Sequence, residues 1–179
     1  MRKVLTLCLV LMSGAILTCG SSYTIRSQQP SSPKLQKYSR VYVGWLDFGE
    51  ENWKKYGFQS PRLWAGSIKE LNVKSLQSYC RSSLSGKTVS GAMARGADAP
   101  AKSDLYIKLK LQKHEVETGL NRIQYLHLNV NYIDMSTGQT KYTAAVVIDS
   151  SGFGVGNYTF EGQLNFAMAN LAKFLASKF

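Results

Sequence analysis

The chain has 179 residues and a formal net charge of +11, from 22 basic and 11 acidic residues. A hydrophobic content of 44% and this length suit one globular domain with its own core, but hardly two. The positive charge favours anionic partners, yet the basic residues are spread along the chain and form no recognised nucleic-acid-binding module. We therefore expect no nucleic acid among its partners.

A signal peptide is predicted at residues 1–18. Arg2 and Lys3 form a basic head, an apolar run covers residues 4–12, and small residues follow, which is the pattern of a secretory signal. A membrane-spanning helix would need about 20 successive apolar residues, and polar residues interrupt this run. Export is therefore expected, and loss of Arg2 and Lys3 lowers the charge from +11 to +9.

Cys19 is the predicted site of lipidation. Residues 16–19 (ILTC) resemble the lipobox of bacterial lipoproteins, which implies cleavage before Cys19 and acylation, palmitate included. The alternative is ordinary cleavage after Ala15, where the small-x-small rule is also satisfied. Residues 20 and 21 (GS) lack the Asp that retains enteric lipoproteins in the inner membrane. A lipidated chain is therefore expected in the outer membrane, facing the periplasm.

The remaining cysteines predict no disulfide. Cys8 leaves with the signal peptide, and lipidation occupies Cys19, so only Cys80 remains. Cys80 falls on a predicted helix, where a small buried thiol is the expectation.

Residues 19–38 are predicted to be a lipidated N-terminus and a flexible tether, because they are rich in Ser, Gln and Pro and show no periodicity. A single globular domain is expected over residues 39–179.

An aromatic loop follows the first predicted strand, residues 40–48. It interleaves three rings with two cations, a combination typical of binding surfaces. The candidate partner surface comprises Trp53, Lys54, Lys55, Tyr56 and Phe58. The alternative is that the rings fold back onto the neighbouring helix as a small satellite cluster.

The rest of the chain predicts an α+β fold. Apolar spacing indicates a helix over residues 62–84, alternation indicates strands over residues 105–111, 125–133 and 139–148, and an apolar stripe indicates a closing helix over residues 159–179. We expect a mostly antiparallel sheet of about four strands, with two main helices packed on one face.

The other face of that sheet should be wet and basic. Lys108 and Lys110 are its candidate binding residues, beside His127, Asn129 and Asn131. The two histidines, at positions 114 and 127, have no third ligand at metal-like spacing, and the acidic residues are scattered. We therefore expect no metal, no cofactor and no catalytic site.

Three stretches carry a resemblance to a known family. They are SDLYIKLKLQ at residues 103–112, YIDMSTGQ at 132–139 and FEGQLNFAMANLAKFLASKF at 160–179. Their order is similar to that in the periplasmic domain of the curli-secretion lipoprotein and in the lipoprotein activators of penicillin-binding proteins. The lipopolysaccharide-assembly lipoprotein is similar in outline. The resemblance implies a non-catalytic module that docks on an envelope partner.

We accordingly predict a non-catalytic outer-membrane lipoprotein that acts as a binding or assembly module of the bacterial cell envelope. Its lipid would hold it on the membrane, and its partner would be an envelope protein or an anionic envelope polymer. Three alternatives stay open: a secreted or surface-exposed adhesin, a lipopolysaccharide-assembly-type lipoprotein, and an enzyme with a polar site on the sheet face.

Overall fold

A computed structural model describes residues 22–99, 102–117, 123–150 and 159–179. The strands are β1 (Tyr23–Gln29), β2 (Arg40–Val43), β3 (Thr88–Gly91), β4 (Leu105–Val116), β5 (Gln124–Asp134) and β6 (Thr140–Asp149). The helices are a short 3-10 helix η1 (Glu50–Trp53), α2 (Pro61–Glu70), the π-helix η2 (Leu71–Leu76), α3 (Gln77–Ser83) and α4 (Phe160–Ala176). Because α2, η2 and α3 follow one another without a break, they form one long helix.

The predicted sheet is wrong in both strand number and strand direction. Six strands form one mixed sheet in the order β1-β6-β5-β4-β2-β3. β2 is parallel to both β3 and β4, while the other pairs are antiparallel. The long helix joins β2 to β3, and a helical crossover of this kind returns the chain in the same direction. The fold is therefore mixed α+β.

The predicted tether is also wrong wherever the structure describes it. Residues 23–29 form β1, which pairs antiparallel with β6 at the edge of the sheet. The Tyr23 ring meets Phe174 of α4 edge-on, with 5.2 Å between ring centroids. Farther on, Leu35 is fully buried, and the Tyr38 hydroxyl donates to Asp134 at 2.7 Å. This stretch therefore belongs to the domain.

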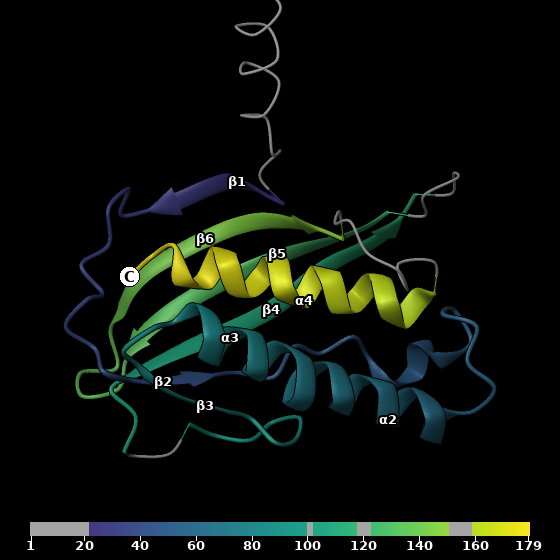
Figure 1. The fold of residues 1–179 in the computed structure, drawn as a ribbon. Helices are drawn as coiled ribbons and strands as arrows, with labels where there is room; N and C mark the ends of the chain where they lie inside the picture. Colours follow the sequence, from purple (N-terminus) through teal and green to yellow (C-terminus); the bar gives the residue numbers. More distant parts are fainter. Residues whose placement is uncertain (1–21, 100–101, 118–122, 151–158) are drawn as a thin grey trace, which may run out of the picture.

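All the long helices lie on one side of the sheet (Figure 1). They cover the face on which alternate residues of β4, β5 and β6 are buried. α4 packs on this face with Leu164, Met168 and Leu171 fully buried, and the Thr159 hydroxyl caps its first turn by accepting from Gly162 N. No described helix or strand covers the opposite face, although Tyr42 on that side of β2 is only 5% exposed.

The π-helix η2 brings a polar side chain into the core. Its wider turn buries Leu71 and Asn72 together, and then Leu76 five positions after Leu71. The Asn72 amide donates to the carbonyls of Leu46 and Ile68, at 3.0 Å each, and accepts from the backbone N–H of Leu46 at 2.7 Å. Asn72 thus provides both hydrogen bonds that the buried backbone of Leu46 requires.

Replacing Asn72 tests the contribution of its hydrogen bonds with the backbone of Leu46. Asn72→Leu keeps the volume but leaves the N–H and carbonyl of Leu46 unpaired in the core, so we expect a loss of about 2–4 kcal/mol in the free energy of unfolding. Urea denaturation followed by circular dichroism measures it. Asn129→Leu, at an exposed position of β5, is the matched control and should change stability by less than about 0.5 kcal/mol. Equal losses in the two variants would contradict the proposed role of Asn72.

Candidate functional site

The structure places the predicted site residues that it describes in two groups. Cys19 and the signal peptide lie outside the described residues. The aromatic loop packs at one end of the helical layer, whereas Lys108 and Lys110 lie on the open face of the sheet. The aromatic loop and the two lysines therefore do not form one site.

The aromatic loop turns its rings inward. Tyr56 stacks at a tilt against three rings, with centroids 4.8 Å from Trp64, 5.0 Å from His114 and 5.1 Å from Phe160. Phe58 contacts Trp64 from the same side, at 4.9 Å. This is the arrangement of the alternative interpretation, a satellite cluster.

The two loop lysines remain exposed. Lys54 lies over the ring of Trp53 at 5.1 Å, and Lys55 lies over Tyr56 at 5.4 Å. Both distances allow a cation–π interaction, and both ammonium groups remain exposed to water. The loop therefore presents cations to solvent while its aromatic area is largely occupied by the protein itself.

His114 is the residue that sequence reasoning missed. A β-bulge between Leu111 and Lys113 shifts the register of β4, so that His114 lies opposite the buried Leu126 and points to the helical side. There Nδ1 is 2.8 Å from the Tyr56 hydroxyl and Nε2 is 2.8 Å from Oε1 of Gln124.

The neighbours of His114 fix its tautomer. Nε2 of Gln124 donates to the carbonyl of Phe160 and to Gln163, so Oε1 of Gln124 is oriented to accept. Nε2 of His114 therefore carries the proton, and Nδ1 accepts from the Tyr56 hydroxyl. Both hydrogen bonds suit the neutral ring.

The pKa of His114 is lowered to about 4, mainly by burial; the hydrogen bond to Gln124 opposes this shift, and the charge of Lys55 adds to it. In the unfolded chain the ring takes up its proton near pH 6.5. Between these values the unfolded state binds more protons, so this contribution to stability is present above pH 6.5 and is lost as the pH falls toward 4.

We predict a loss of about 2 kcal/mol in the free energy of unfolding between pH 7 and pH 5. Urea denaturation at a series of pH values measures it. His114→Gln should remove most of this pH dependence, whereas His127→Gln should retain it. An unchanged pH dependence in His114→Gln would show that another group is responsible.

The open face of the sheet is built from the outward residues of β4 and β5. Lys108 lies opposite Asn131 and Lys110 lies opposite Asn129. Both lysines are exposed. Within the described part of the chain, neither has a carboxylate at ion-pair distance. These two charges are therefore available to a partner.

Beyond the bulge between Leu111 and Lys113, the positive charge of this face is partly neutralised. Glu115 forms ion pairs with Lys113 and, when its ring is protonated, with His127, whose Nε2 is 2.5 Å from Oε2. These two partners lower the pKa of Glu115. Along β4, the cations without an ion pair within the described ranges are thus Lys108 and Lys110.

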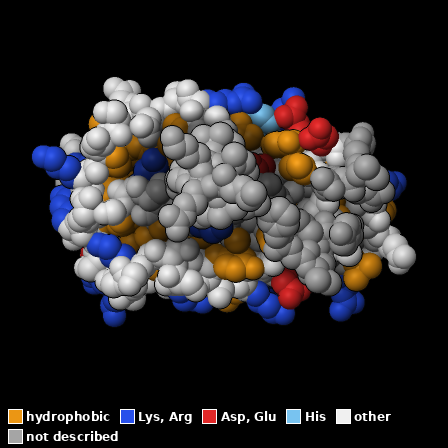
Figure 2. Space-filling model, turned by 45° about the horizontal axis from the view of Figure 1, so that its top comes forward, with side chains coloured by type: hydrophobic (Ala, Val, Ile, Leu, Met, Phe, Trp, Pro, Cys, Tyr) orange, Lys and Arg blue, Asp and Glu red, His pale blue; other side chains and the backbone are white. Residues whose placement is uncertain are grey.

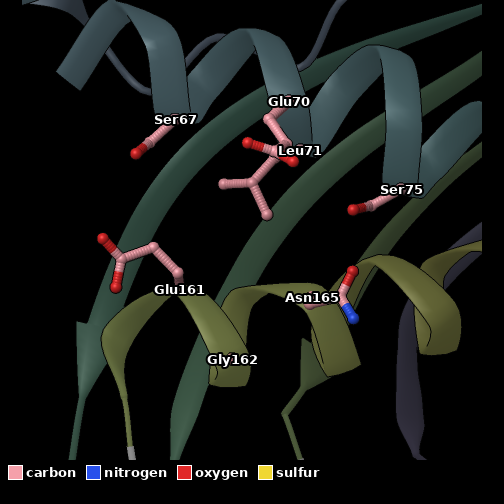
Figure 3. Close-up of a pocket in the computed structure, with 7 residues that line it drawn as sticks. All are labelled: Ser67, Glu70, Leu71, Ser75, Glu161, Gly162 and Asn165. Atoms are coloured by element: carbon pink, nitrogen blue, oxygen red, sulfur yellow. The ribbon is translucent and has the colours of Figure 1, made fainter. Parts of the chain in front are cut away.

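A cleft of about 350 Å³ lies between the long helix and α4 (Figure 3). Glu70 and Ser67 line it from one helix and Glu161 from the other, with Leu71 between them. Glu70 is exposed and pairs with Lys74 of its own helix at 3.0 Å. The described residues that line the cleft include the two carboxylates Glu70 and Glu161 but no His, Cys or Lys.

A second hollow of about 460 Å³ opens at the end of the sheet where β4 begins. Its two carboxylates already have structural roles. Asp104 accepts from the side chain of Arg40 and from the backbone N–H groups of Ser39 and Arg40, and Asp134 accepts from Tyr38 and Ser136. These hydrogen bonds hold the pKa of each carboxyl well below its usual range.

Cys80 is fully buried, and burial raises the pKa of its thiol to about 12. Its environment is that of a core residue.

The described residues contain no group of three or more His, Cys, Asp or Glu side chains that could hold a metal ion. No helix in the described ranges is both long and apolar enough to cross a bilayer.

No protein-family model matches the chain, and no curated protein does. Solved structures that it resembles include a PelC dodecamer from Paraburkholderia phytofirmans, at 14% identity and a TM-score of 0.47, over 84% of this chain and 95% of that one. Protein XCC0632 from Xanthomonas campestris, of the DUF330 family, has 13% identity and a TM-score of 0.43, over 86% and 89%. A minor lipoprotein from Acinetobacter baumannii has 10% identity and a TM-score of 0.32, over 78% and 91%.

These likenesses are too distant to assign a function to this chain. They include a lipoprotein, but they give no support to the specific resemblance to the curli-secretion lipoprotein or to the activators of penicillin-binding proteins.

Proposed function

We propose that the protein is a non-catalytic lipoprotein of the bacterial outer membrane that faces the periplasm and binds an anionic envelope partner through the open face of its sheet. The observation that carries the proposal is the pair of exposed lysines, Lys108 and Lys110, on a sheet face that no described helix or strand covers. A face of this kind meets an anionic partner without first breaking an internal ion pair.

The charge of the whole chain supports an anionic partner. Basic residues outnumber acidic ones by 22 to 11. Lysine and arginine side chains lie around the rim of the side shown in Figure 2, where acidic side chains are few. A field of this sign attracts polyanions over about one Debye length.

The chemistry of the polar groups supports binding rather than catalysis. His114 is held neutral between Tyr56 and Gln124. Asp104 and Asp134, the carboxyls with the most strongly lowered pKa, accept hydrogen bonds from residues within the fold. A general acid or base needs reach to a substrate, and these groups are directed at the protein itself.

The lipid anchor is supported by the sequence pattern at residues 1–19 and is tested by intact mass spectrometry. We expect the mature protein from its own membranes to begin at Cys19 and to carry acyl mass. The Cys19→Ala variant should be lost from the membrane fraction. The Cys80→Ala variant, the matched control, should still be found there. A mature chain that begins at Ile16 or Ser22 without acyl mass would refute the anchor.

Orientation separates the periplasmic proposal from the adhesin alternative. Protease added to intact cells should leave a periplasm-facing domain uncut and should degrade it only after the outer membrane is opened. Degradation on intact cells would favour the surface-exposed adhesin.

A further inference from the structure

Four outward side chains lie together at the centre of the open face. Strand register places Lys108 opposite Asn131 and Lys110 opposite Asn129. The two positions on each strand are about 6.8 Å apart, and side chains directly opposite one another on paired strands have Cβ atoms about 5 Å apart. The donor cluster, as we name Lys108, Lys110, Asn129 and Asn131, therefore forms one compact rectangle.

Each member of the donor cluster has an N–H donor without a partner in the described part of the chain. Neither lysine has a carboxylate at ion-pair distance. Oδ1 of Asn131 accepts from the Thr143 hydroxyl of β6 at 2.6 Å, so the amide is held by its oxygen and its NH2 group is left to donate elsewhere. The Asn129 side chain is exposed and makes no hydrogen bond to a described residue.

This combination of donors suits a ligand that carries both charged and neutral oxygen acceptors. Carboxylate, sulfate and phosphate oxygens accept charge-assisted hydrogen bonds from lysine. An amide NH2 group also donates to neutral hydroxyl or ether oxygens. An acidic sugar presents both kinds of acceptor on one compact unit, whereas an acidic polypeptide carries its charges on flexible side chains.

We propose that the anionic partner of the open face is an acidic glycan, and that the donor cluster holds one of its acidic sugar units. The inference rests on the proposed function, because it names the partner class for the same face. The ammonium groups of Lys108 and Lys110 bind the acid group. The amides of Asn129 and Asn131 bind hydroxyl or ring oxygens of the same sugar or the next one.

The surroundings of the donor cluster give the site a direction. Tyr106 lies two residues before Lys108 on the same face, is partly exposed, and is held edge-on by Tyr42, with 5.8 Å between ring centroids. The C–H groups on the flat side of a sugar ring can pack on such an aromatic ring. At the other end of the face, Glu115 and Glu117 would repel an acidic chain. The glycan is therefore expected to extend from the donor cluster toward Tyr106.

An acidic protein fits the open face less well. Protein interfaces have a centre that is enriched in aromatic residues and depleted in lysine. Here the centre is the donor cluster. The large apolar side chains that are exposed among the described residues lie elsewhere: Leu63 on α2, Met93 after β3, and Val116 opposite the inward Gln124.

A purely structural explanation would make the donor cluster an ordinary solvated face. Asn is depleted in strands, however, and β5 is an interior strand that needs no protection against pairing with another chain. A solvated face also usually mixes charges of both signs. Two asparagines beside two lysines, with no carboxylate among them, therefore do not follow from strand stability or solubility.

The test measures binding by isothermal titration calorimetry, with the mature protein purified from its own membranes in a non-ionic detergent. Short oligomers of galacturonic acid and of mannuronic acid serve as acidic glycans. Methyl-esterified oligomers of galacturonic acid keep the sugar chain and lose the charge. Polyglutamate of matched charge keeps the charge and lacks the sugar.

We expect at least one acidic oligomer to bind about tenfold or more tightly than polyglutamate and the methyl ester. Lys108→Gln should weaken binding of both acidic probes, whereas Asn129→Val should weaken only that of the glycan, by about threefold or more. Val is favoured in strands, so this variant keeps the fold. Lys69→Gln and Gln59→Val, at exposed positions outside the sheet, are the matched controls and should bind as the unaltered chain does.

The outcomes separate this inference from the proposed function. Equal affinity for the acidic oligomers and polyglutamate, with no effect of Asn129→Val, would overturn the glycan inference. If Lys108→Gln still weakened that binding, the anionic partner surface would stand. No binding of any acidic probe, or binding that Lys108→Gln and Asn129→Val leave unchanged, would contradict both.

Discussion

The fold depends on a sheet that is apolar on one face only. Along β5 the residues that point to the helices, Leu126, Leu128 and Val130, are at most 1% exposed, while those between them reach solvent. Burial of this face contributes the main favourable free energy. The long helix and α4 must therefore lie on the same side, which leaves the opposite face without a covering helix in the described part of the chain.

Inside the helical layer, a few polar side chains determine details that apolar packing leaves undefined. Asn72 fixes the chain after β2 to the long helix through Leu46. His114 and Gln124 connect the aromatic loop, the sheet and the start of α4. Because each of these three buried side chains has hydrogen-bond partners, their burial leaves no polar group unpaired and favours one arrangement of the chain.

The sequence predicted those elements in which a hydrophobic pattern repeats over many residues. The alternation in β4, β5 and β6 and the apolar stripe of α4 are long enough to be visible without a structure. β1 escaped prediction because only its first residues, Tyr23 and Ile25, contact the core, and the polar SQQ that follows has the composition of a linker. An edge strand gains most of its stability from its neighbour, which a local pattern does not show.

The bulge in β4 could have been predicted from the sequence after Leu111. Continued alternation after Leu111 would bury Lys113, which is implausible for an unpaired lysine, whereas one extra residue buries His114 instead. The parallel pairing of β2 required the three-dimensional path of the long helix. The outward position of Lys108 and Lys110 on β4 needed only the alternation, whereas their role in binding a partner stays a prediction.

The account is tested most directly by photo-crosslinking in living cells at the open face. A photoreactive amino acid is placed at Lys110 on β4, and in a second strain at Lys69 on α2, and covalent adducts are compared. A partner bound to the open face predicts adducts at position 110 that disappear with Lys108→Gln, and few at position 69. Adducts at position 69 with none at position 110 would show that the helical layer, rather than the open face, meets the partner.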